Sequence, residues 1–257
     1  MPVGAITNYI DVAQLVLYVF WFFFFALIFY IRTEDKREGY PVQSQRMGGK
    51  MKMMEGFPPL PKPKTFKMPH TGTIVQKPSP DRAQPRLNAV PIADFPGAAL
   101  TPTGNPMLAG VGPGSYAVRA EEPDLTETGE PRVRPMRVAK HFSVAKGDPD
   151  PRGWPVLGCD GAQGGVCKEI WVDTAEPCVR YFEIDAGGKR VLAPTPLCNV
   201  RTKKGVIEVD SITGAQFKDA PTLKSYDQIT LAEEDKVVAY LGAGKLYATP
   251  DRVEPYL

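Results

Sequence analysis

The sequence predicts one membrane-spanning helix, then an extended proline-rich segment, and finally a small β-rich domain with a short C-terminal helix. Three observations support this fold class. An uncharged apolar run lies near the N-terminus, twenty of the 27 prolines fall between Pro41 and Pro155, and short β-branched runs separated by turns follow Trp154. The predicted parts are a tail over residues 1–11, a transmembrane helix over 12–31, the extended segment over 32–153 and the β-rich domain over 154–257.

The apolar run extends from Val12 to Ile31 and contains one polar amide, Gln14, and nine aromatic residues. Twenty helical residues span about 30 Å, the thickness of a bilayer's hydrocarbon core. Because the run is apolar on all sides, it suits lipid better than the core of a soluble protein. A cleaved signal peptide is disfavoured because no basic residue precedes the run, and charged residues follow it where a cleavage site would lie.

Basic residues near the helix predict its orientation. The first eleven residues contain no Lys or Arg, whereas six basic residues follow the run: Arg32, Lys36, Arg37, Arg46, Lys50 and Lys52. The positive-inside rule therefore predicts a periplasmic N-terminus and a cytoplasmic location for the rest of the chain. Tyr30 lies near the end of the span. Trp21 lies in its central aromatic block, which contacts either lipid or neighbouring helices.

The segment after the helix is dominated by proline. Residues 57–64 cannot form a helix interior or a central strand, because proline removes backbone donors and restricts φ. Low-complexity disorder is one interpretation. Well-spaced apolar residues nevertheless continue from Phe57 to Tyr116. This pattern favours extended chain that lies over another surface and is ordered by a partner.

The C-terminal part has the pattern of short strands. Turn signals at 185–188 and 203–205 separate β-branched and aromatic runs, which is typical of a small antiparallel barrel or sandwich. Thr230 followed by Glu233 forms a capping box and predicts the start of a helix, which should end by Gly242–Gly244. The expected strands are 166–173, 179–184, 189–192 and 206–210.

Composition excludes several classes of function. The net charge of +2 gives no indication of nucleic-acid binding. The four cysteines contain no CxxC pair, and we expect reduced thiols on the cytoplasmic side. Their irregular spacing and the presence of only two histidines argue against a zinc site. No catalytic, cofactor-binding or metal-ligating motif stands out.

Carboxylates are the remaining candidates for chemistry. Asp173 and Glu176 directly follow the run Ile170–Val172. Further acids lie downstream and upstream in the chain: Glu183 and Asp185, and Glu121, Glu122 and Asp124. By composition alone these acids are ordinary surface residues. If they line a wet internal path, raised and coupled pKa values would let them relay protons at neutral pH.

Six segments, in order along the chain, resemble the H subunit of the purple-bacterial photosynthetic reaction centre. The likeness runs nearly from end to end, and its specificity lies in the ordered set rather than in one motif. The segments are Arg37–Pro41, Pro61–Phe66, Pro102–Met107, Val111–Pro113, Ile170–Asp173 and Leu231–Lys236.

The resemblance implies a barrel of the PRC type, a location in the inner photosynthetic membrane and a role as an accessory subunit rather than an enzyme. Such a subunit caps the L and M subunits, stabilises the complex and the quinone sites, and relays protons to the secondary quinone. Core antenna polypeptides and membrane lipids are further expected partners. Bacteriochlorophyll, bacteriopheophytin, quinone and iron would belong to partner subunits, with bound phospholipid as an additional expected ligand.

The resemblance also implies roles for individual residues. Asp173 and Glu176 match the proton path, and Asp124 matches its upstream acid. Relatives have a histidine pair shortly after that acid, whereas this chain has none there, so Glu127 or Glu130 is expected to replace it. The expected membrane and partner interface comprises Trp21, Tyr30, Arg32, Arg37 and Tyr40.

Two other classes of function remain as alternatives. One is a membrane-anchored PRC-barrel adaptor that only scaffolds other proteins. The other is a membrane-tethered enzyme, which is disfavoured because no convergent His, Ser or Cys set is present.

Overall fold

The computed structural model describes residues 4–7, 10–45, 51–79, 87–95 and 97–253. It divides the chain into two compact units. The first comprises residues 1–82 and 93–98, and the second comprises residues 83–92 and 99–257. Parts of the predicted tail over residues 1–11 and of the segment over 32–153 lie outside the described residues.

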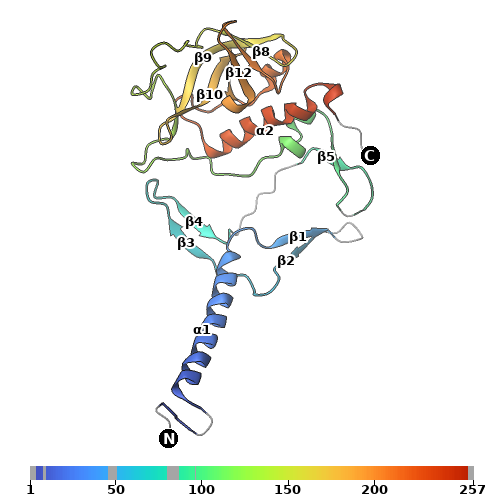
Figure 1. The fold of residues 1–257 in the computed structure, drawn as a ribbon. Helices are drawn as coiled ribbons and strands as arrows, with labels where there is room; N and C mark the ends of the chain where they lie inside the picture. Colours follow the sequence, from blue (N-terminus) through green and yellow to red (C-terminus); the bar gives the residue numbers. More distant parts are fainter. Residues whose placement is uncertain (1–3, 8–9, 46–50, 80–86, 96, 254–257) are drawn as a thin grey trace. The chain divides into compact units, whose positions relative to one another are not determined.

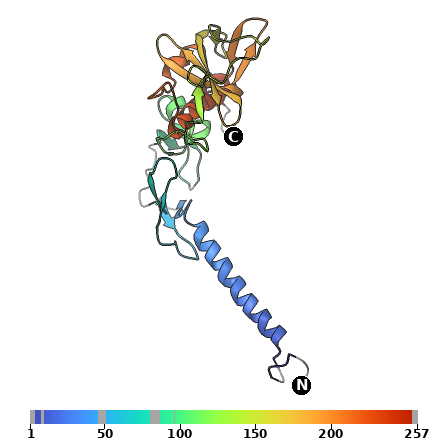
Figure 2. The same ribbon diagram turned by 90° about the vertical axis from the view of Figure 1, so that its left-hand side faces the viewer.

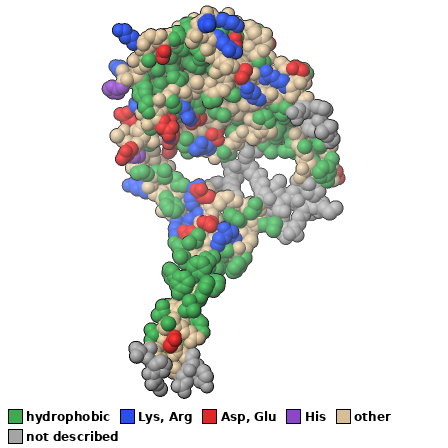
Figure 3. All heavy atoms as spheres, in the orientation of Figure 1, with side chains coloured by type: hydrophobic (Ala, Val, Ile, Leu, Met, Phe, Trp, Pro, Cys, Tyr) green, Lys and Arg blue, Asp and Glu red, His purple; other side chains and the backbone are tan. Residues whose placement is uncertain are grey.

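The first unit is built on helix α1 (Val12–Asp35), which begins at the cap residue Asp11, whose side chain accepts a hydrogen bond from the Gln14 amide (2.7 Å). None of its residues is buried, and hydrophobic side chains cover the visible face of the helix (Figure 3). It is the one helix in the described part of the chain that is long and apolar enough to cross a membrane. The helix continues four residues beyond the predicted end at Ile31, because the polar residues that follow contain no helix breaker.

Two short hairpins follow α1 in the same unit: β1 (Val42–Gln45) with β2 (Met51–Met54), and β3 (Lys64–Lys67) with β4 (Ile74–Lys77). Both lie at the C-terminal end of α1 (Figure 1), while the rest of the helix projects away from them (Figure 2). The segment that the sequence predicted as extended is therefore partly organised into local antiparallel pairs. In each hairpin, the antiparallel pairing provides hydrogen-bonding partners for backbone N–H and C=O groups of the residues between the prolines.

Two basic side chains, Lys36 and Arg37, join the end of α1 to these hairpins. The Lys36 ammonium is buried, donates to the carbonyls of Glu55 (2.8 Å) and Pro58, and lies 5.1 Å from the centre of the Tyr40 ring. Arg37 pairs with Glu34 and donates to the carbonyls of Lys62 (2.8 Å) and Lys77 (3.1 Å). We call Lys36, Arg37 and Tyr40 the junction. Its basic side chains hold the hairpin region by donating hydrogen bonds to backbone carbonyl groups.

The second unit contains a curved seven-stranded sheet with the order β11-β10-β9-β8-β13-β12, and β7 pairs with β9. All pairs are antiparallel except β8 with β13. A small hairpin of β5 (Ala89–Pro91) and β6 (Leu100–Pro102) and two short 3-10 turns, Pro106–Leu108 and Gly112–Gly114, precede the sheet. The strands are β7 (Val133–Pro135), β8 (Pro155–Leu157), β9 (Gln163–Asp173), β10 (Cys178–Asp185), β11 (Arg190–Pro194), β12 (Cys198–Arg201) and β13 (Val206–Val209).

The predicted turns at 185–188 and 203–205 are confirmed, because they connect β10 to β11 and β12 to β13. Two features differ from the sequence prediction. The sheet includes β7, which lies upstream of residue 154, and it contains one parallel pair. Both depend on pairing between segments far apart in the chain, which local patterns do not reveal.

Helix α2 (Leu231–Tyr247) packs against the sheet and confirms the predicted capping box. Thr230 and Glu233 exchange hydrogen bonds at its start. The prediction that the helix ends by Gly242–Gly244 is wrong, because the glycines serve close packing. A Cβ at Gly244 would lie 2.2 Å from the Ser211 carbonyl oxygen, so only glycine lets the helix approach that backbone.

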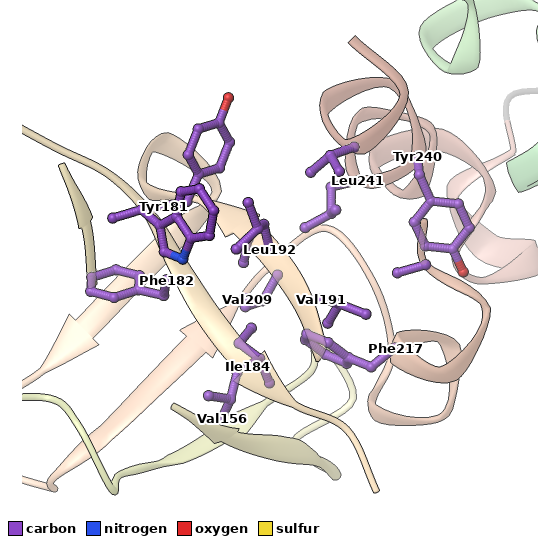
Figure 4. Close-up of a cluster of buried hydrophobic side chains, with 14 of the residues drawn as sticks. Val156, Tyr181, Phe182, Ile184, Val191, Leu192, Val209, Phe217, Tyr240 and Leu241 are labelled. Carbon is purple, nitrogen blue, oxygen red and sulfur yellow. The ribbon is translucent and has the colours of Figure 1, made fainter. Parts of the chain in front are cut away.

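The hydrophobic core of the second unit lies between the sheet and α2. Figure 4 shows Tyr240 and Leu241 of α2 in the same cluster as Ile184, Val191 and Leu192 of the strands. Trp171 and Phe217 are also fully buried. This packing fixes the position of β9, whose end carries the candidate site.

Candidate functional site

The candidate site begins where β9 ends. The side chain of Asp173, the last residue of the strand, is 1% exposed. The register of β7 pairs Val133 with Asp173, so Arg132, one residue before β7, lies beside the carboxylate. The Arg132 Nε atom lies 2.9 Å from both carboxylate oxygens of Asp173.

The turn after β9 positions the second carboxylate. Asp173 accepts hydrogen bonds from the backbone amides of Ala175 (2.9 Å) and Glu176 (3.0 Å). Thr174 binds the Arg132 carbonyl through both its amide and its hydroxyl, each at 2.9 Å. As a result, Glu176 returns toward Arg132, with 3.3 Å between Glu176 Oε1 and Arg132 Nη2.

A third carboxylate completes the group. Asp124 Oδ2 lies 3.5 Å from Arg132 Nη1. We call Arg132, Asp173, Glu176 and Asp124 the Arg132 cluster. The side chains of its acids range from buried Asp173 through Asp124, 49% exposed, to Glu176, 75% exposed. The cluster therefore places one buried and two exposed carboxylates around Arg132 at the end of β9.

The electrostatics of Asp173 differ from the sequence-based expectation of a raised pKa. Burial raises its pKa, but the hydrogen bond from Arg132 and those from the Glu176 and Ala175 amides outweigh that effect, and the net pKa is below its usual value. The same pairing raises the pKa of Arg132. Asp173 is therefore ionised at neutral pH, and the prediction of a raised pKa is wrong for this residue.

Glu127 does not join the Arg132 cluster. It lines a cavity of about 440 Å³ whose other lining residues include Glu130, Arg134, His141 and Thr174. Arg134 Nη2 pairs with Glu130 Oε2 at 2.6 Å. The cavity shares the turn after β9 with the cluster, because Thr174 and Ala175 line it.

Another buried carboxylate, Glu183, is held apart from the cluster. It accepts a hydrogen bond from Trp171 Nε1 (2.9 Å) and lies within 3.2 Å of Arg137 and 3.4 Å of Arg190. Arg137 also donates to the Tyr226 carbonyl. This network of hydrogen bonds and ion pairs connects β9, β10 and the loop before α2, so we assign it to the stability of the fold.

All four cysteines are free. Burial raises the pKa of Cys167 and of Cys198 to about 12, so both are neutral thiols at physiological pH. In the part of the chain that the structure describes, no group of three or more His, Cys, Asp or Glu side chains is arranged to hold a metal ion.

The predicted interface residues divide into two groups. Trp21, Tyr30 and Arg32 lie on α1 with exposed side chains. Arg37 and Tyr40 belong to the junction described above, where their contacts are within the chain. Arg132 was not a candidate from the sequence, because its contact with Asp173 depends on a strand pairing across 41 residues.

An apolar helix long enough to cross a membrane and a sheet packed against one helix fit the class of membrane-anchored β-rich proteins. Residues 4–138 match the family model of the photosynthetic reaction centre H-chain N-terminal region, and residues 144–216 match the PRC-barrel domain. Because the first match covers more than half of the 257 residues, the chain belongs to the H-chain family of photosynthetic reaction centres. The fold class predicted from the sequence is thereby confirmed, including the barrel type.

Proposed function

We propose that this chain caps the L and M subunits of a reaction centre, stabilises the complex and its quinone sites, and relays protons to the secondary quinone. The observation that carries the relay is the convergence of Asp173, Glu176 and Asp124 on Arg132. Family membership supports association with a reaction centre, and the graded exposure of the three acids supports a path from solvent inward.

The proposed topology follows from the charge distribution. The short N-terminus would lie in the periplasm, and the basic residues after α1 would hold the rest of the chain in the cytoplasm, against the inner photosynthetic membrane. Bacteriochlorophyll, bacteriopheophytin, quinone and iron would be bound by partner subunits. Core antenna polypeptides and membrane lipids, including bound phospholipid, complete the proposed surroundings. The chain would act as an accessory subunit and not as an enzyme.

Asp173 and Glu176 would have different parts in the relay. Asp173, with its lowered pKa, holds a negative charge that fixes Arg132 and shapes the turn carrying Glu176. Asp173 is therefore a positioning residue for Glu176. Glu176 would be the group that exchanges protons, because its carboxylate is exposed to solvent and also contacts Arg132 Nη2 of the cluster.

Flash kinetics on the purified complex test this proposal. Glu176→Gln keeps the approximate shape but removes proton exchange, so it should slow the second, proton-coupled electron transfer to the quinone. The light-driven charge separation should be unchanged, because the proposal places every pigment in partner subunits. Glu208→Gln is the matched control, because Glu208 is also a surface acid paired with an arginine, Arg201, at 2.7 Å.

Asp173→Asn completes the experiment. It should also slow the second transfer, through loss of the turn that positions Glu176. If Glu176→Gln and Asp173→Asn both leave the second transfer at the wild-type rate, the cluster has no part in proton delivery. If the absorbance spectrum of the purified complex still shows bacteriochlorophyll, the pigment-binding partners are present, and the chain would then act only as a scaffold without a role in proton transfer.

A further inference from the structure

Three of the four side chains with hydrogen-bonding groups in the run 12–31 lie on one side of α1. Gln14, Tyr18 and Trp21 follow one another at spacings of four and three residues, so they share a face with Phe25. Gln14 Nε2 donates to the Tyr18 hydroxyl at 2.8 Å, and the Trp21 and Phe25 rings stack with their centres 5.9 Å apart. We call Gln14, Tyr18, Trp21 and Phe25 the polar stripe.

The opposite side of α1 carries only hydrocarbon side chains. Val16, Phe20, Phe23 and Leu27 follow one another at the same spacings, about half a turn away from the polar stripe. All four are exposed in the chain, and we call them the apolar stripe. Tyr30, the fourth polar side chain of the run, lies off the polar stripe, but it is one residue from the end of the run, where a tyrosine hydroxyl reaches the headgroup region.

Trp21 places a hydrogen-bond donor at the middle of the run. About 15 Å of helix separate this residue from either end of the run, so its ring lies near the centre of a bilayer that α1 crosses. The indole N–H forms no hydrogen bond with any residue that the structure describes, and the Trp21 side chain is 45% exposed. No water is present at this depth to accept the hydrogen bond, and an unpaired donor there is unfavourable. Trp21 therefore needs an acceptor from outside the chain.

A neighbouring protein helix meets this need better than lipid does. The acyl chains at the bilayer centre carry no acceptor, because the ester carbonyls of lipids lie at the headgroup boundary. A membrane-spanning helix can present a hydroxyl, amide or carbonyl oxygen at any depth. Membership of the H-chain family indicates that the neighbour belongs to a reaction centre.

We propose that the polar stripe is the side of α1 that packs against a membrane-spanning helix of the L or M subunit, with the Trp21 N–H donating to an oxygen atom of that helix. The apolar stripe then faces lipid. This inference rests on the proposed association with L and M. Tyr18 and Phe25, one turn before and after Trp21, exclude lipid from the hydrogen bond, and the directed contact fixes the rotation of α1 about its own axis.

Photo-crosslinking of the complex in membranes tests which side of α1 meets the partner. The photoreactive residue p-benzoylphenylalanine in place of Tyr18 or Phe25 should form an adduct with L or M. The same residue in place of Val16 or Leu27, at matched depths on the apolar stripe, should form no adduct with either subunit.

A second measurement tests the hydrogen bond itself. Benzothienylalanine in place of Trp21 keeps the shape of the ring but has sulfur where indole has N–H. This replacement should make the chain leave the purified complex several-fold faster in detergent. Phe23→Leu on the apolar stripe is the matched control: it changes the side-chain volume more, yet it should leave the release rate unchanged.

Several results would overturn the inference. Adducts of the polar stripe with lipid, with antenna polypeptides or with a second copy of this chain, in place of L or M, would reject the assigned partner. An unchanged release rate after loss of the Trp21 N–H would reject the hydrogen bond. In each case, a purified complex that still contains L, M and bacteriochlorophyll leaves the proposed function intact. A chain that purifies without L, M and pigment would instead reject the proposed function itself.

Discussion

Arg132 and Asp173 lie 41 residues apart in the chain, yet the guanidinium Nε is 2.9 Å from both oxygens of the buried carboxylate. The pairing of β7 with β9 produces this contact, and the contact in turn organises the candidate site. Removal of either partner should therefore affect both stability and the position of Glu176.

Arg132→Gln should destabilise the protein by about 3 kcal/mol, the lower end of the cost of breaking a buried pair, because Arg132 itself is partly solvated. The buried Asp173 would lose its compensating charge. Thermal unfolding of the full chain in detergent measures the effect. Arg201→Gln, which removes the solvent-exposed pair with Glu208, should change stability little. Equal losses in the two variants would contradict the assigned role of Arg132.

Stability should depend on pH through Asp173. Its folded pKa lies below the ordinary value of 3.8, so its contribution is fully present above that value and disappears as the pH falls through the folded pKa. Asp173→Asn should therefore reduce the free energy of unfolding at pH 7, and the difference from wild type should shrink below about pH 3.8. A difference that stays constant from pH 7 to pH 3 would show that the charge of Asp173 is not stabilising.

Lys36→Met should loosen the junction at the end of α1. The substitution leaves the Glu55 and Pro58 carbonyls without their donor, which costs about 1–3 kcal/mol for a buried polar group. Limited proteolysis should then cut residues 40–80 faster than in wild type. Lys67→Met, on the exposed face of β3, is the control and should be cut at the wild-type rate.

Gly244→Ala should destabilise α2 even though alanine favours helix formation. The added Cβ would meet the Ser211 backbone at 2.2 Å, and such overpacking costs about 1–3 kcal/mol. The unfolding midpoint should fall more than in Gly242→Ala, where the nearest atom, the Pro113 carbonyl oxygen, is 3.2 Å away. A higher midpoint for Gly244→Ala would mean that helix propensity outweighs packing here.

Phe23→Arg should reduce assembly of the complex, because a central arginine costs about 2.5–3.5 kcal/mol in a membrane-spanning helix. The amount of assembled complex in membranes measures the effect. Phe23→Leu keeps the apolar character and serves as the control. Normal assembly of Phe23→Arg would show that this depth of the helix does not face lipid.

Local sequence signals were sufficient for much of the fold. The apolar run, the Thr230–Glu233 capping box and the turn at 185–188 each depend on neighbouring residues, and all three appear in the structure. Strands β7 and β8 were missed because each has three residues and contains proline, so pairing with β9 rather than intrinsic propensity maintains them. The end of α2 was misjudged for a similar reason. Gly244 allows close packing of the helix against the Ser211 backbone and does not mark the helix end.

The candidate site was only partly accessible from the sequence. Asp173 and Glu176 are close in the chain, and their turn was a local feature. Arg132 reaches the site through tertiary structure, without a motif that marks it. The direction of the Asp173 pKa was misjudged partly for the same reason, because Arg132, which lowers this pKa together with two neighbouring backbone amides, is distant in the chain.

Time-resolved infrared spectroscopy of the complex after flash excitation tests the central claim, proton exchange by Glu176, most directly. A relay carboxyl must be protonated once in each turnover. The account predicts a transient carboxylic-acid C=O band that rises and decays with quinone reduction in wild type and in Glu208→Gln, and is absent in Glu176→Gln. The same band in wild type and Glu176→Gln would contradict the account.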